Sequence, residues 1–107
     1  MKFDVSVTLL FNSEEAAKAF RFGTSRISMG EFYPAPDFLG KHSLLVKNVL
    51  YNKSMTNVGI HFAKGRLMVS TYLTNYKQTA AQNERDLIEF VRAIEPLLNA
   101  KLTFEEV

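Results

Sequence analysis

The chain has 107 residues, 47% of them hydrophobic, and a formal net charge of +2 at pH 7. This length fits one domain, residues 1–107, with a single hydrophobic core. The absence of cysteine excludes a disulfide scaffold, a thiolate zinc site and a cysteine nucleophile. No apolar run approaches the roughly 20 residues that cross a bilayer. Because the first apolar run is short and contains Asp4, we expect no signal peptide and an intracellular protein, cytoplasmic or nuclear, without a membrane partner.

Residues 3–11 alternate between apolar and polar side chains. The apolar members of this run are Phe3, Val5, Val7, Leu9 and Phe11. A period of two predicts a β-strand with one buried face. Asn12 and Glu15 then have the spacing of a helix N-cap and its capping-box partner, and Gly23 is a stop signal. We therefore expect a short helix that ends near Phe22.

The segment 24–42 combines proline and glycine with aromatic residues, which predicts a packed connection rather than disorder. Three strands are expected after it, over residues 43–51, 57–63 and 66–73. The Lys64-Gly65 step predicts a hairpin between the last two, with Gly65 at a positive φ.

A second helix is expected to begin after Thr79, because Gln82 stands at capping-box spacing. Its apolar residues at helical spacing are Leu87, Val91, Ile94 and Leu98. Pro96 should bend or end this helix, and residues 101–107 should form a last short strand or a loose tail. The order strand, helix, three strands, helix predicts an α+β fold, an antiparallel sheet with two helices packed on one face.

Such a fold leaves the other face of the sheet uncovered. On the strand 66–73, the residues directed toward the helices are Leu67, Val69 and Leu73, and those directed away are Arg66, Met68, Ser70 and Tyr72. For the strand 57–63 the pattern leaves both orientations possible. If its small side faces the helices, its apolar residues Val58, Ile60 and Phe62 lie on the open face, and an apolar surface of that size needs a partner.

Charge is distributed unevenly along the chain. No Asp or Glu occurs in residues 38–83, here called the acid-free segment. Its basic residues are Lys41, Lys47, Lys53, Lys64, Arg66 and Lys77. Basic side chains interleaved with aromatic ones are typical of a surface that meets a polyanion, although a solvated face that merely lacks acids gives the same pattern.

Motifs for catalysis are missing. His42 and His61 have no partner at metal-ligand spacing, and Glu14-Glu15 and Glu105-Glu106 are adjacent pairs rather than an acid/base couple. The Lys64-Gly65 turn lacks the glycine spacing of a phosphate-binding loop. We therefore expect a protein that is not an enzyme and that holds no cofactor and no metal.

Three segments resemble the TATA-box-binding protein family. Residues 57–71 (NVGIHFAKGRLMVST) resemble the hairpin of one repeat of that family. Residues 30–38 (GEFYPAPDF) resemble its Glu-Tyr-x-Pro-x-x-Phe segment, and residues 90–98 (FVRAIEPLL) resemble the end of its long helix. The order of the expected elements is also similar.

The resemblance implies a sheet-face module that binds the minor groove of duplex DNA. Two phenylalanines per repeat insert between base steps in that family, and the matching positions are Phe38 and Phe62. The implied groove-facing residues are Ile60, Met68 and Ser70, with Lys64 and Arg66 near phosphates. Lys47 of the acid-free segment and Tyr72 of the open face complete the candidate binding residues.

The chain departs from the family in several places. It has the length of one repeat, so the family's two-repeat saddle would require a homodimer. Asp4 stands where the family has an asparagine, and a carboxylate there would repel DNA. His61 replaces a buried aliphatic residue, and the interval between Phe38 and Phe62 is longer.

Two functions therefore remain open. The first is a homodimeric DNA-binding module with a role in transcription. The second is a protein-interaction module or inhibitor that uses the same face and basic rim against an acidic protein or a second copy of itself.

Overall fold

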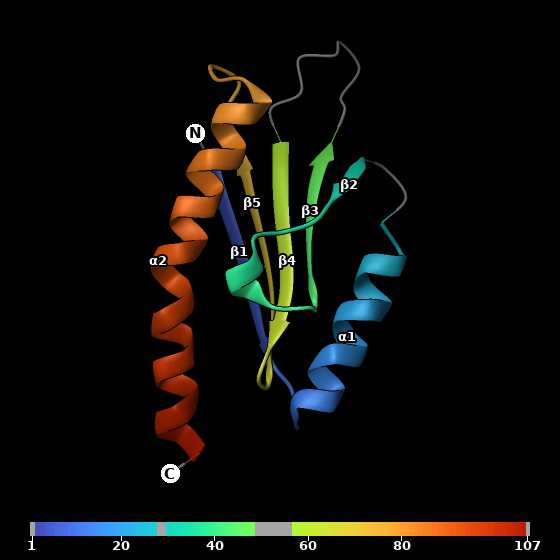
Figure 1. Cartoon of the computed structure of the whole chain (residues 1–107), viewed down its shortest axis with the longest axis vertical. Coiled ribbons are helices and arrows are strands. Elements are labelled where there is room, and N and C mark those ends of the chain that lie inside the picture. Colours follow the sequence, from blue (N-terminus) through green and yellow to red (C-terminus); the bar gives the residue numbers. More distant parts are fainter. Residues whose placement is uncertain (1, 28–29, 49–56, 107) are drawn as a thin grey trace.

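The computed structural model describes residues 2–27, 30–48 and 57–106. The elements in chain order are β1 (Lys2–Leu9), α1 (Ser13–Ser25), β2 (Glu31–Tyr33), the 3-10 helix η1 (Asp37–Leu39), β3 (Ser43–Asn48), β4 (Asn57–Lys64), β5 (Leu67–Thr74) and α2 (Ala80–Glu106). The five strands form one antiparallel sheet in the order β1-β5-β4-β3-β2 (Figure 1). The predicted α+β class is confirmed. Residues 49–51 of the predicted strand 43–51 lie outside the described residues.

Helix starts follow the local signals in the sequence. The Asn12 side chain accepts a hydrogen bond of 2.8 Å from the Glu15 N–H, which caps α1. Thr79 and Gln82 make the two reciprocal bonds of a capping box, 2.9 Å and 3.2 Å long. Each bond satisfies an N–H that has no partner inside the helix, which defines where the helix begins.

Helix ends depart from the expectation. α1 continues through Gly23 to Ser25, and α2 continues past Pro96 to Glu106 instead of giving way to a terminal strand. A proline removes one donor from a helix, and a helix of this length keeps its remaining hydrogen bonds on both sides. The last turns of α2 extend beyond the β4–β5 hairpin (Figure 1).

The main core lies between the sheet and α2. Its buried side chains come from β4, β5, α2 and the neighbouring η1 and β3: Val58, Ile60, Phe62, Leu67, Val69, Leu73, Leu87, Val91, Leu39 and Leu45. A second, smaller cluster joins Ala16 and Phe20 of α1 to Ala63 of β4. Phe62 and Ala63 are adjacent in β4, so their side chains face opposite sides of the sheet. Phe62 clusters with residues of α2 and Ala63 with residues of α1, so the two helices lie on opposite faces.

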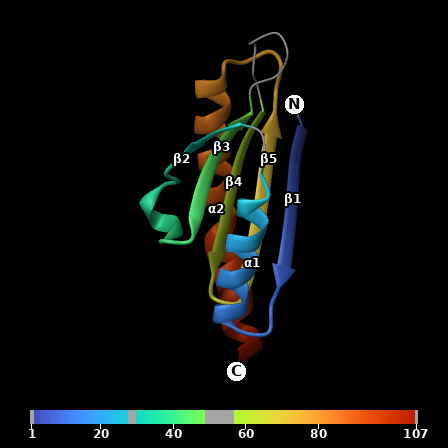
Figure 2. The same ribbon diagram turned by 90° about the vertical axis from the view of Figure 1, so that its right-hand side faces the viewer.

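The two helices therefore cover both faces, which corrects the prediction that they share one. Figure 2 shows α1 in front of the sheet and α2 behind it. The physical reason lies in β4, where Val58 to Ala63 are all buried. A central strand whose side chains are buried on both sides needs a cover on each face.

The strands β1 and β2 form the two edges of the sheet (Figure 2). β1 pairs with β5 along its whole length, from Lys2 opposite Thr74 to Leu9 opposite Leu67. β2 arises inside the segment that was predicted to be a connection and is only three residues long. The two edges thus differ greatly in length.

Candidate functional site

The predicted binding face does not exist as one surface. Phe62 is 2% exposed and stands opposite Val69, so it faces α2 together with Ile60. Met68 and Ser70 lie on the other side of β5, toward α1. The register therefore separates residues that were predicted to line one groove. The assignment of Ile60 and Phe62 to an open face is wrong, because α2 covers the side of β4 that carries them.

Phe38, the other predicted wedge, is half-buried in η1 at the edge of the main core. The guanidinium of Arg92 lies 4.6 Å from the centre of its ring. The Phe38 carbonyl accepts a hydrogen bond of 3.1 Å from the Lys64 ammonium. Phe38 is thus held by contacts inside the chain.

The predicted phosphate contacts are engaged within the molecule. Lys64 forms an ion pair of 2.7 Å with Glu95 of α2, whose side chain is nearly buried. The Arg66 Nε donates a 3.1 Å hydrogen bond to the carbonyl of Leu10. These contacts connect the β4–β5 hairpin to α2 and to the end of β1. Neither side chain extends freely from the surface.

Lys47, the remaining predicted cation, is also paired. Its ammonium lies 3.3 Å from a carboxylate oxygen of Glu84 and 4.6 Å from the centre of the Tyr33 ring. Tyr33 in turn donates a hydrogen bond to Glu31, and this bond raises the pKa of the Tyr33 hydroxyl above its ordinary value. The positive charge of the acid-free segment is therefore partly neutralised by acids from outside it.

A polar network occupies the α1 side of the sheet. The His61 Nδ1 lies 2.9 Å from the Ser70 hydroxyl, and the His61 Nε2 lies 2.8 Å from the Tyr72 hydroxyl. Ser70 donates a weak hydrogen bond of 3.8 Å to the Met68 sulfur. The tautomer of the imidazole decides which partner of each pair donates. Ser70 and Tyr72 were predicted to face away from both helices, but they lie on the α1 side of the sheet and bind His61.

The buried position of His61 favours the neutral form of its imidazole. Burial lowers the pKa of His61 below 6.5 and raises the pKa of the Tyr72 hydroxyl above 10.0. Each ring nitrogen of His61 already has a partner, which leaves the imidazole no free nitrogen for a substrate or metal. Among the described residues, no group of three or more His, Cys, Asp or Glu side chains could hold a metal ion.

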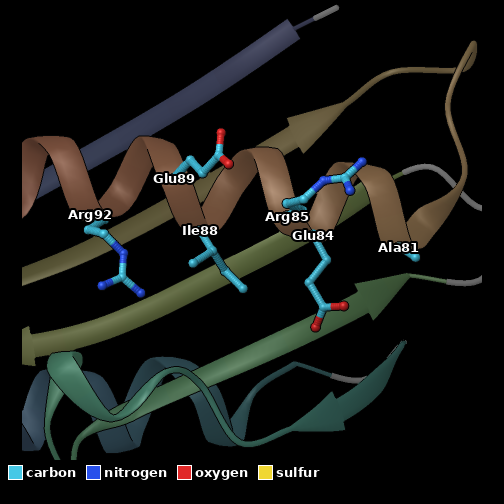
Figure 3. Close-up of a pocket in the computed structure, with 6 residues that line it drawn as sticks. All are labelled: Ala81, Glu84, Arg85, Ile88, Glu89 and Arg92. Carbon is cyan, nitrogen blue, oxygen red and sulfur yellow. The ribbon is translucent and has the colours of Figure 1, made fainter.

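An open groove of about 400 Å³ runs along the exposed side of α2. It is lined by Ala81, Glu84, Arg85, Ile88, Glu89 and Arg92. In Figure 3, Glu84, Ile88 and Arg92 point from α2 toward β3 and η1, whereas Glu89 points the other way. Two of these side chains already have partners within the chain. The Glu84 carboxylate forms an ion pair with Lys47, and the Arg92 guanidinium lies over the Phe38 ring.

β1 is an edge strand with an exposed apolar face. Its apolar residues were predicted to form a buried face, but Phe3, Val5, Val7 and Leu9 are 39–49% exposed. They lie on the same face as α2, where the Phe3 ring approaches the Phe90 ring at 4.7 Å. Because α2 lies over β4 and β5, it leaves most of this stripe uncovered. We call these four residues the β1 stripe.

Within the part of the chain that the structure describes, no strand pairs with β1 along this edge. The Leu10 N–H donates a 2.7 Å hydrogen bond to the Arg66 carbonyl, in the register that continues along β1 and β5. Since successive residues direct their N–H groups to opposite edges, the even-numbered residues bond to β5. The N–H and C=O groups of the β1 stripe therefore point away from the sheet.

The alternation of residues 3–11 was the signal for this surface. It identified a strand with one apolar face, but the position of that strand at a sheet edge depends on which strand it pairs with.

No protein-family model matches this chain, and neither a curated protein nor a solved structure matches it. Within the described residues, no helix is long and apolar enough to cross a membrane.

Proposed function

We propose that this chain is a non-catalytic protein-interaction module and that β1 is its contact surface. The single observation that carries the proposal is the β1 stripe, four partly exposed apolar side chains on an eight-residue edge strand. An unpaired edge with an apolar face offers a partner both main-chain hydrogen bonds and apolar contact.

The comparison between the two sheet edges supports this choice. Proteins protect an edge strand from unwanted pairing by making it short or by adding charges, proline or a bulge. β2 has these protections, since it is three residues long, contains Glu31 and precedes Pro34. β1 is uninterrupted in its pairing with β5, and its two charged residues, Lys2 and Asp4, are both near its start, with Asp4 on the face opposite the stripe. An edge with so little protection over residues 5–9 favours a binding role.

A capture experiment tests the proposal. Val7→Pro removes an N–H that points away from β5, so the variant should keep its sheet and lose the edge. The matched control is Phe32→Lys on β2, where the side chain is also about half exposed. Proteins retained from source-cell extract, and untagged copies of the chain, should bind the wild type and Phe32→Lys but not Val7→Pro. An identical bound set for all three proteins would refute the proposal.

Duplex DNA is a second candidate partner, favoured by the absence of acids in residues 38–83. It is the weaker candidate, because Phe62 is buried and Lys47 and Lys64 are held in ion pairs. Gel-shift measurements on duplex and single-stranded DNA across salt concentrations discriminate the two. Affinity that falls linearly with the logarithm of the salt concentration would support DNA binding through counterion release.

A further inference from the structure

We infer that β1 pairs with β1 of a second copy of this chain, antiparallel and about a two-fold axis at Ser6. This inference rests on the proposed function and names its partner. The pairing would join two five-stranded sheets into one and would place both copies of α2 on the same face. The evidence is the symmetry of the β1 sequence, the direction of its free backbone groups and the position of its charge.

The sequence of β1 is nearly symmetric about Ser6. Val5 and Val7 lie one residue before and one residue after Ser6, and Phe3 and Leu9 lie three residues before and after it. In a two-fold interface each contact occurs twice, so residues equally far from the axis meet one another. Val5 would therefore meet Val7 of the second copy, and Phe3 would meet Leu9 of the second copy.

The backbone supports this register. Residues that face each other across an antiparallel pair must both direct their N–H and C=O groups into the gap to exchange two hydrogen bonds. All members of the β1 stripe direct these groups away from β5. With the axis at Ser6, each stripe residue faces another stripe residue, so the free N–H and C=O groups of the edge find partners.

Side chains and charge favour the same register. Residues that face each other across paired strands share a face, so the β1 stripe of one copy continues into that of the other. Asp4 would stand opposite Thr8 of the second copy. An axis at Asp4 would place two carboxylates opposite each other, which is unfavourable. An axis at Val7 would require Phe11 to pair, although Phe11 lies in the bend before α1.

Concentration-dependent mass is the first measurement. Analytical ultracentrifugation from about 1 to 200 µM should show the 12.2 kDa chain converting to a species of twice that mass. Val5→Glu and Val7→Lys, each placing a charge in the stripe, should weaken this association roughly tenfold or more. Phe32→Lys, the control on the other edge, should dimerise like the wild type.

Mixing the two charge variants tests the register. In the inferred pairing, the substituted position 5 of one chain meets the substituted position 7 of the other, so Val5→Glu and Val7→Lys together should restore the dimer. The matched control mixes Val5→Glu with Val5→Lys, which should stay monomeric. Restoration by the control mixture alone would place the axis at Val5 and overturn the inferred register.

The outcomes also separate this inference from the proposed function. A wild-type chain that stays at 12.2 kDa throughout overturns self-pairing. If Val7→Pro then still abolishes capture of a different protein while Phe32→Lys does not, the interaction module stands with another partner. If neither dimerisation nor capture depends on β1, both proposals fail.

Discussion

Phe62 is enclosed by the main core, with its side chain between β4 and α2. Val69 stands opposite it on β5, and Val91 of α2 belongs to the same core cluster. The same residue was predicted to be an exposed wedge, and burial gives it a structural role. Its removal should therefore affect stability first.

Phe62→Ala should lower the free energy of unfolding by about 3 to 5 kcal/mol, because it removes buried contacts and leaves a cavity. Urea unfolding followed by circular dichroism measures this change. Phe32→Ala is the control and should change the free energy of unfolding by less than about 1 kcal/mol, since Phe32 is 51% exposed. Equal losses in the two variants would contradict the burial of Phe62.

His61 should make the stability of the protein depend on pH. Burial lowers the pKa of the folded imidazole below the 6.5 that it has in an unfolded chain. Between these two values the unfolded chain binds more protons, so stability rises with pH in this range. The stabilising contribution is present above about pH 6.5 and is lost as the pH falls toward the lower, folded-state pKa.

Thermal unfolding between pH 5 and 7.5 measures this effect. The wild-type midpoint should fall as the pH decreases below about 6.5, and His61→Gln should remove much of that slope. His42→Gln is the matched control, because His42 is outside the hydrogen-bond network of Ser70 and Tyr72. If the slope survives in His61→Gln but disappears in His42→Gln, the pH dependence belongs to His42 and the prediction is contradicted.

The pairing of β4 with β5 depends on a glycine beneath an aromatic ring. Gly59 stands opposite Tyr72, and a Cβ at Gly59 would lie only 2.5 Å from the Tyr72 ring. A glycine in the middle of a strand is otherwise unfavourable, and it is placed here because the ring lies directly over the backbone. The position of that ring also supports the hydrogen bond between Tyr72 and His61.

Gly59→Ala should therefore destabilise the protein by about 1 to 3 kcal/mol, since the Tyr72 ring must move. The matched control is Gly23→Ala in α1, where a Cβ would make an ordinary contact of 3.8 Å with the Met68 side chain. Alanine is the better helix former, so Gly23→Ala should stabilise the protein by up to about 1 kcal/mol. Chemical denaturation of both variants checks the predicted difference in sign.

For the whole molecule, the uneven protection of the two sheet edges has a thermodynamic consequence. If two chains pair through β1, the folded dimer is favoured by mass action, and the unfolding midpoint must rise with protein concentration. A monomer shows no such dependence. The measurement does not require the partner to be identified, because the second copy is the partner.

Thermal midpoints should increase between about 5 and 200 µM for the wild type and for Phe32→Lys. Val7→Lys should show a smaller increase over the same range, because the charge weakens pairing at the edge. Differential scanning calorimetry measures all three proteins in the same buffer. An increase in Val7→Lys as large as that of the wild type would locate the contact elsewhere on the molecule.

Short-range interactions made several features of this protein predictable from its sequence. The caps at Asn12 and Thr79 involve residues three apart, and Gly65 adopts a φ of +57° inside its own turn. The alternation in β1, β4 and β5 identified strands for the same reason, since the period of two belongs to a single strand. The antiparallel α+β class followed from the order of these elements.

Contacts between distant segments decided the rest. Phe62 has the same local pattern whether it faces solvent or a helix, and only the position of α2 decides that it is buried. Lys64 was predicted to meet phosphate, but Glu95, 31 positions later in the sequence, lies within 2.7 Å of it. The β1 stripe is exposed because α2 packs over β4 and β5 and leaves most of β1 uncovered. Strand periodicity defines a face, whereas burial of that face depends on which elements pack against it.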